Sequence, residues 1–331
     1  MLKFLGNIVE QLDLALEHLS KGDANNARFG LMLTDNAVEI ALHQFAKDHK
    51  ALRDSEGWMR NKYKDAALLQ RALGRHFEDK VKLAKSLGKL SNDTAESIVI
   101  FHGVRNEVYH IGLQHEAVLP ALAAFYFEVA CGFLGSYQPL YYSWSSGQTY
   151  PDRSLKYLSR PDMLTVGGEQ YKVACQKLAA QAGFDPAGLI EALADHIDEL
   201  IEDQDSSIDL ISTGAPQKRA RDQVIIDCQA WAMTFSDEGA KFLAESGCPD
   251  VKIFGRVQWI TDHYPFAVKR DPISAWRKRA KSVRHEKEPH AALWKYYAFM
   301  GQTATLRDLI TDAGYQVEAY IDQEIDRLRG R

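Results

Sequence analysis

Cysteine is scarce in this 331-residue sequence, and the four that occur form no Cys-x-x-Cys pair. They lie far apart, at Cys131, Cys175, Cys228 and Cys248. A disulfide framework or a cysteine-ligated zinc site is therefore not expected, and a reducing compartment such as the cytoplasm fits. Proline is also nearly absent from residues 1–136, where Pro120 is the only one, so long helices can form there without interruption.

Two further absences concern membranes. No window approaches about eighteen consecutive apolar residues, so we expect no membrane span and no membrane partner. The opening residues lead directly into polar Asn7 and acidic Glu10, unlike the apolar core of a signal peptide. The net charge is −5, so any contact with nucleic acid needs a local basic patch.

Helical spacing dominates residues 1–136. Apolar residues recur every three or four positions from Leu2 to Leu19, and Asp23 or Asn25 can cap a second helix that runs to about Lys50. Further helices are predicted over 58–89 with breaks at Gly74 and Gly88, from Ser91 or Asp93 to about 111, and over 117–135. The last of these is apolar nearly all round, which predicts burial inside an antiparallel bundle of four or five helices.

The rest of the chain divides into a connector and a second domain. Residues 137–168 are rich in proline, glycine and serine, but their six tyrosine and tryptophan residues indicate packing across the first domain. Residues 169–331 predict a mainly helical domain, with helices near 169–182, 186–204, 216–234, 237–246, 272–284 and 289–329. Alternation from Val251 to Thr261 predicts a single strand. The predicted fold class is all-α.

One helix face differs from an ordinary solvated surface. On a helical wheel, Phe101, Val104, Val108 and Ile111 form an apolar stripe facing the core. An adjoining arc of about 140° carries His102, Arg105, Asn106, Tyr109 and His110. Solvated faces usually carry lysine, glutamate and glutamine, whereas these side chains bind phosphate or transfer protons.

The segment Arg105-Asn106-Glu107-Val108-Tyr109-His110 resembles the Arg-Asn-x-x-x-His form of the Arg-x4-6-His signature of HEPN domains. These helical bundles occur in many prokaryotic ribonuclease toxins, antiviral-defence proteins and RNA-guided RNA-cleaving effectors. The likeness covers residues 1–136. The bare spacing recurs at 71–76, 279–285 and 284–290, but only Arg105 is followed by asparagine and flanked by the apolar stripe. A HEPN variant has tyrosine two residues after the histidine; Gly112 stands there instead.

A polar cluster on the second helix accompanies the motif. Asp35, Asn36, Glu39 and His43 fall within about 100° of one another, opposite an apolar face. HEPN domains commonly show a similar cluster packed near the arginine–histidine helix. A carboxylate there would pair with Arg105 or orient His110. An ordinary amphipathic helix is an equally weighted interpretation.

The resemblance implies a metal-independent endoribonuclease without cofactors, a toxin or antiviral-defence effector. RNA carries its own nucleophile, the 2′-hydroxyl, so the enzyme must supply proton transfer and a cation for the phosphate. His110 and Arg105 suit these roles, and Asn106 can fix the imidazole or contact the ribose. Asp35, Asn36, Glu39, Tyr109 and His102 are supporting candidates. HEPN ribonucleases are thought to dimerise so that two motifs face one cleft, which implies a homodimer and a cyclic 2′,3′-phosphate product.

RNA contacts are predicted at basic residues that share a domain with the motif: Arg71, Arg75, Lys82 and Lys85. The basic segment 276–287 is interpreted as a solvated helix face in preference to a surface that holds an RNA backbone. The acidic run from Glu191 to Asp209 is interpreted as solvated or as a docking site for the basic segment of a partner chain. His263 and His290 are interpreted as structural.

Two other functions stay open. One is a non-catalytic HEPN-like module that binds RNA or a protein. An antitoxin or regulatory partner is expected both for the ribonuclease and for this binding module. The other is a helical regulatory protein in which Arg105 and His110 are only hydrogen-bonded structure.

Overall fold

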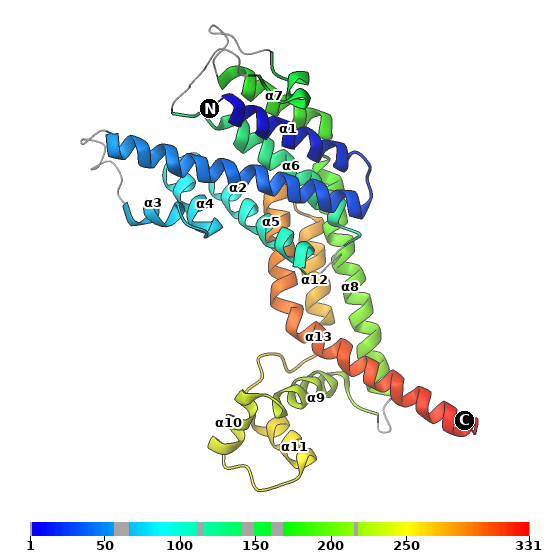
Figure 1. Cartoon of the computed structure of the whole chain (residues 1–331). Helices are drawn as coiled ribbons and strands as arrows, with labels where there is room; N and C mark the ends of the chain where they lie inside the picture. The colour runs from blue at the N-terminus through cyan, green and yellow to red at the C-terminus, as the bar shows by residue number, and fades with distance from the viewer. Residues whose placement is uncertain are drawn as a thin grey trace. The chain divides into compact units, whose positions relative to one another are not determined.

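The computed structural model describes residues 2–55, 66–110, 116–140, 149–159, 168–214 and 218–330, without the side chain of His110. All regular structure in these residues is helical, which confirms the predicted all-α class (Figure 1). The elements are α1 (Leu2–Leu19), α2 (Ala24–Ser55), α3 (Ala66–Ala72), α4 (Phe77–Ser86), α5 (Asn92–His110), α6 (Leu119–Ser136), η2 (Asp152–Lys156), α7 (Gly168–Ala182), α8 (Pro186–Gly214), α9 (Arg221–Thr234), α10 (Asp237–Glu245), α11 (Ile253–His263), α12 (Ile273–Arg284) and α13 (Pro289–Leu328).

The chain forms two compact units whose limits differ from the predicted domains. Unit 1 comprises Met1–Leu193 and Glu286–Trp294, and unit 2 comprises Ala194–His285 and Lys295–Arg331. Unit 1 extends well beyond residue 136 because α7 packs on α1 and α6 and buries Tyr171 and Cys175. Both α8 and α13 contribute residues to each unit.

Local sequence signals set the helix limits in unit 1. Asp23 caps α2 by accepting a hydrogen bond from the backbone N–H of Asn26 at 2.9 Å, and Ser91 caps α5 by accepting from Thr94 at 3.1 Å. Gly88 follows α4 with a φ of 72°, a conformation that favours glycine. The expected break after α4 is therefore confirmed.

The interior of unit 1 is built around α6. This helix is long and apolar enough to cross a membrane by length and composition alone, but 67% of it is buried inside the protein. It packs on α1, α2, α5 and α7, as predicted for a core helix of a bundle. Ring stacking of Phe101 on Tyr126, with centroids 4.6 Å apart, links α5 to α6.

Part of the aromatic connector lies against this bundle, as expected. Tyr137 is buried and donates its hydroxyl to Asp48 at 2.9 Å. Tyr157 donates to Asp13 of α1 at 2.8 Å, and Arg153 and Lys156 of η2 pair with the same carboxylate. Tyr141, Tyr142 and Trp144 lie outside the described residues.

In unit 2, the predicted strand from Val251 to Thr261 is wrong, because all of its residues from Ile253 onward belong to α11. The positions of Val257, Ile260 and Thr261 also satisfy helical spacing, and Ile260 is fully buried while α11 packs on α9. Tertiary burial decided between two periodicities that a short segment leaves open.

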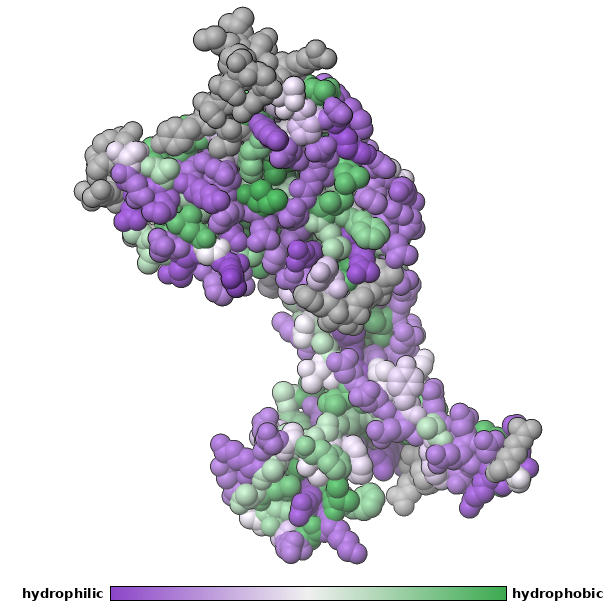
Figure 2. All heavy atoms as spheres, in the orientation of Figure 1, coloured by the Kyte–Doolittle hydropathy of each residue, from purple (hydrophilic) through white to green (hydrophobic). Residues whose placement is uncertain are grey.

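Charged residues of α8 and α12 pair within unit 2. Arg284 donates to Asp195 at 2.6 Å and Asp198 at 2.7 Å, and Arg277 contacts Glu202 and Asp205 of α8. The acidic run thus binds the basic segment of its own chain. Figure 2 shows hydrophilic side chains over most of the visible surface, with apolar side chains gathered over α9–α11, where Phe235 and Phe254 are exposed.

Candidate functional site

The predicted motif face lies where four helices meet. The helix α5 packs on α2, α4 and α6, and α2 also packs on α4 and α6 (Figure 1). Phe101, Val104 and Val108 of α5 are buried, as predicted for the apolar stripe; Ile111 lies outside the described residues. The adjoining polar face is thereby held against α2 and α4 rather than fully exposed.

Asp35 of α2 is the buried centre of the site, with no exposed surface. Its carboxylate accepts a hydrogen bond from the Tyr126 hydroxyl at 2.8 Å and one from His102 Nδ1 at 3.0 Å. Arg105 Nε lies 3.5 Å from Asp35 Oδ2. Burial, followed by the charge of Asp35, raises the pKa of Tyr126 well above its ordinary value, so this hydroxyl stays protonated and donates.

Arg105 is oriented by three neighbours. Besides the contact with Asp35, Nη1 donates to Asn106 Oδ1 at 2.8 Å, and the guanidinium lies 5.7 Å from the centroid of the Tyr109 ring. The expected pairing of Arg105 with a carboxylate of α2 is present. Asn106 contacts this arginine, whereas the sequence suggested a contact with His110 or the ribose. Among the described residues, Nη2 has no hydrogen-bond partner, and the side chain is 28% exposed.

A second ion pair lies beside this network. The Lys80 side chain is nearly fully buried, and its Nζ lies 3.1 Å from Glu39 Oε1. One turn further along α2, burial and then the charges of Lys47 and Lys80 lower the pKa of His43. Glu39 therefore balances Lys80 of α4, while Asp35 balances Arg105 of α5.

Asp35, Glu39 and His102 are also near enough to suggest a cation site. One ligand atom from each lies within 4.8 Å of the others. However, Asp35 already contacts Tyr126, His102 and Arg105, and Glu39 is bound to Lys80. The two arginine and lysine charges offset the two carboxylates, so the arrangement fits an ion-pair network and we assign no metal to it.

The remaining predicted residues occupy the edge of the site or lie beyond it. Asn36 is exposed on α2, and Tyr109 is 54% exposed at the end of α5. His110 is the last residue of α5, and its side chain lies outside the described residues.

Sequence reasoning missed Tyr126, Lys80 and Phe77. Tyr126 had a usable signal, because it is a buried hydroxyl in a mostly apolar helix and must find a partner. Lys80 stood among many surface lysines, and Phe77 read as an ordinary core residue, so neither was distinguishable in the sequence.

The four predicted RNA-binding residues are exposed on α3, α4 and the turn between them. Arg71 lies 3.4 Å from Asp79, and Lys82 pairs with Glu78 at 3.0 Å. Exposed pairs of this kind are weak, so a polyanion can displace the acidic partners.

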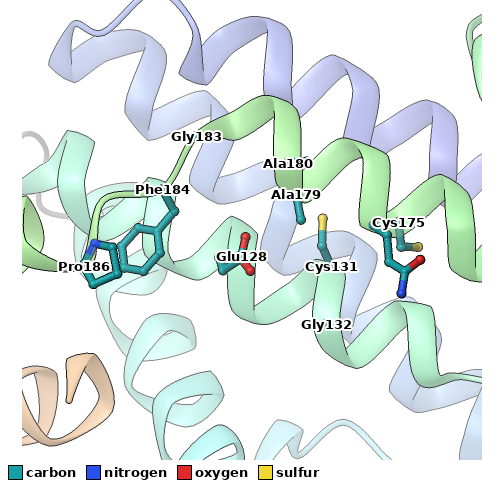
Figure 3. Close-up of a pocket in the computed structure, with 10 residues that line it drawn as sticks. Glu128, Cys131, Gly132, Cys175, Ala179, Ala180, Gly183, Phe184 and Pro186 are labelled. Carbon is teal, nitrogen blue, oxygen red and sulfur yellow. The ribbon is translucent and has the colours of Figure 1, made fainter.

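Two other cavities carry different chemistry. One, of about 560 Å³, lies between α6, α7 and the start of α8 and is lined largely by small residues (Figure 3). Burial raises the pKa of the Cys131 thiol well above its ordinary range and that of Cys175 to about 12, so both remain protonated.

A cavity of about 760 Å³ in unit 2 combines Trp231, Phe254 and Tyr320 with three carboxylates and one paired arginine, which disfavours phosphate. Unit 1 is therefore the better place to seek RNA contacts.

His290 and His263 have structural partners. His290 Nδ1 lies 2.7 Å from the Ser97 hydroxyl, and its ring contacts Phe125 edge-on. His263 Nδ1 lies 2.9 Å from the carbonyl oxygen of Trp259 and stacks on that indole. These contacts agree with the structural interpretation of both residues.

Comparison with known proteins gave no match to this chain among family models, curated proteins or solved structures.

Proposed function

We propose that this chain is a metal-independent endoribonuclease of HEPN type that acts as a toxin or antiviral-defence effector. The observation that carries the proposal is the buried Asp35 carboxylate, which orients Arg105 on the face of α5 that ends at His110. A buried charge is costly unless it is paired, and a merely solvated helix face needs none. The polar face of α5 is therefore an organised site and differs from a solvated helix surface.

In the proposed reaction, the 2′-hydroxyl of RNA attacks the adjacent phosphorus and the 5′-oxygen leaves, producing a cyclic 2′,3′-phosphate. Arg105 binds the phosphate and offsets its developing charge, with Nη2 available for this contact. His110 transfers a proton. Asn106 and Asp35 hold the guanidinium, and Tyr109 packs against it.

The proposal includes RNA as substrate, a homodimer, an antitoxin or regulatory partner, and a cytoplasmic location. RNA would approach across α3 and α4, where Arg71, Arg75, Lys82 and Lys85 are exposed. A homodimer would place two arginine–histidine sets in one cleft, and an isologous interface requires that the motif face meets its own copy.

A non-catalytic binding module is the second candidate. The hydrogen bond from Arg105 to Asn106 and the ion pair with Asp35 would equally stabilise a scaffold. Only activity separates the two functions, because a shared fold does not determine chemistry.

The first test is His110→Ala, with His285→Ala as the matched control. His285 follows Arg279 at a similar spacing but is exposed in unit 2. We expect His110→Ala to lose RNA cleavage by at least about 100-fold with a nearly unchanged melting temperature, while His285→Ala keeps wild-type cleavage. The readout is cleavage of a labelled RNA in excess EDTA, with end-group analysis of the products. Undiminished cleavage by His110→Ala, or a strict requirement for Mg²⁺ or Mn²⁺, would remove the mechanism.

A further inference from the structure

The imidazole of His102 is fixed on two sides. Its Nδ1 lies 3.0 Å from Asp35 Oδ2, and its ring stacks on Phe77 with centroids 3.8 Å apart and planes within 4°. A carboxylate can only accept a hydrogen bond, so Nδ1 carries the proton and Nε2 is the other, variable nitrogen. A buried carboxylate that orients a histidine in this way is the arrangement used to prepare an imidazole for proton transfer.

The other side of His102 borders a cavity. This cavity of about 370 Å³ lies between α4 and α5 and is lined by His76, Phe77, Glu78, Asp79 and Lys82 together with His102. The His102 side chain is 20% exposed, and no hydrogen bond from a described residue reaches Nε2. The nitrogen that Asp35 leaves unused therefore remains available to a group entering the cavity.

His102 also stands at a useful position relative to Arg105. It precedes Arg105 by three residues and His110 by eight, which correspond to about 4.5 Å and about 12 Å along the helix axis. Arg105 therefore lies between the two histidines along α5. A phosphate bound by Arg105 has a histidine toward either end of the helix.

We infer that His102 supplies the second proton-transfer group of the proposed ribonuclease, with Asp35 as its positioning residue. The inference rests on the proposed function. One histidine accepts the proton of the 2′-hydroxyl as the 2′-oxygen bonds to phosphorus. The bond between phosphorus and the 5′-oxygen breaks, and that oxygen takes a proton from the other histidine. The two protonation states are thereby exchanged, and proton exchange with water restores them.

This assignment completes the acid–base pair within one chain. The sequence alone offered a single arginine–histidine set and required a second copy to complete it. With His102 included, a homodimer is compatible with activity but is not needed to assemble the reacting groups. The charged and titratable groups that face His102 from its own helix and from α2, α4 and α6 are Arg105, Asp35, Glu39, Lys80, Glu78, Asp79, Lys82 and Tyr126, with His76 just before α4.

The decisive variant is His102→Asn. The amide nitrogen of asparagine can still donate to Asp35 but cannot exchange a proton with substrate. We expect RNA cleavage by full-length protein to fall by at least about 100-fold with little change in the melting temperature. His285→Asn, an exposed histidine at the end of α12, is the matched control and should cleave like the wild type.

A rescue experiment separates proton transfer from a structural role. The cavity created by His102→Ala should admit free imidazoles, and the restored rate should follow the basicity of the added imidazole across a methylated series. A side chain that only fills space would give rescue that follows molecular size. Rescue independent of basicity would overturn the inference.

Two further outcomes test the inference separately from the proposed function. Cleavage by His102→Asn within about threefold of the wild type, while His110→Ala is inactive, would overturn the role of His102 and leave the ribonuclease in place. Recovery of activity on mixing Arg105→Ala with His110→Ala chains would overturn the assembly of the reacting groups within one chain, because a site complete in one chain cannot be restored by mixing. No cleavage by the wild-type protein would reject the proposed function itself.

Discussion

Arg105 in unit 1 and Arg284 in unit 2 both precede a histidine at the spacing of the HEPN signature, but their surroundings differ. Arg105 faces the fully buried Asp35, which also binds His102 and Tyr126. Arg284 contacts Asp195 and Asp198, whose side chains are about half exposed. A spacing within the Arg-x4-6-His range thus accompanies a buried network in one unit and a solvated ion pair in the other. Burial of the partner carboxylate distinguishes the organised site around Arg105 from the solvated ion pair of Arg284.

The largest effect expected from this difference is on stability. Asp35→Ala removes the hydrogen-bond acceptor of His102 and of the Tyr126 hydroxyl together with the counter-charge of Arg105, and we expect a loss of about 3 kcal/mol in the free energy of unfolding. Asp198→Ala, the same substitution at the exposed pair, should cost less than about 1 kcal/mol. Urea unfolding of both variants measures the contrast. Equal costs would mean that burial of the carboxylate does not separate the two regions.

A smaller effect is expected from a single hydroxyl. Tyr126→Phe removes one donor from buried Asp35 and should cost about 1–2 kcal/mol, because the carboxylate keeps its other contacts. Tyr264→Phe is the matched change in unit 2, where the hydroxyl donates to exposed Glu238 at 2.5 Å. It should change stability much less than Tyr126→Phe, because the lost hydrogen bond is replaced by water. Chemical denaturation of the two variants side by side provides the measurement, and a reversed order would contradict the comparison.

The smallest effect concerns pH and the third motif-like match, Arg284 to His290. Burial lowers the pKa of His290, although Asp93 and Glu288 oppose this. The unfolded chain therefore takes up a proton at higher pH than the folded chain, and stability falls as the pH drops below about 6.5. His290→Gln should lose part of that pH dependence between pH 7 and 5.5, whereas His285→Gln should keep it. An unchanged slope in His290→Gln would show that the buried imidazole is not linked to folding.

Much of the fold can be predicted from the sequence because the signals for a helix lie within a few residues of one another. The apolar spacing of Leu2 to Leu19 and the caps at Asp23 and Ser91 depend on residues only a few positions apart. The prediction of a strand from Val251 to Thr261 was wrong because its short apolar pattern satisfies both the strand and the helix period. Burial of Ile260, with α11 packed on α9, favours the helix. The unit boundary also escaped prediction, since packing of α7 on α6 depends on residues distant in the chain.

The candidate site likewise contains residues that local sequence patterns predicted and residues that only the structure revealed. The sequence brought Asp35 and Arg105 into one hypothesis because polar residues gathered on one face of each helix. It did not indicate Tyr126 or Lys80, whose roles depend on which helix they oppose. Likewise, the acidic run of α8 and the basic segment of α12 were both noticed, but only the structure pairs Arg284 with Asp198. Local patterns identify unusual faces; partners across the core require coordinates.

The contact between Ser97 and His290 has a consequence for the order in which this protein is made. These residues are 193 positions apart, and the segment that contains His290 belongs to unit 1. A ribosome must therefore synthesise the chain as far as Glu286–Trp294 before the last piece of unit 1 becomes available. An N-terminal fragment that ends at Leu193 leaves Ser97 and Phe125 without the imidazole that covers them. The unit that carries the motif is therefore completed only after Ala194–His285 of unit 2 have been synthesised.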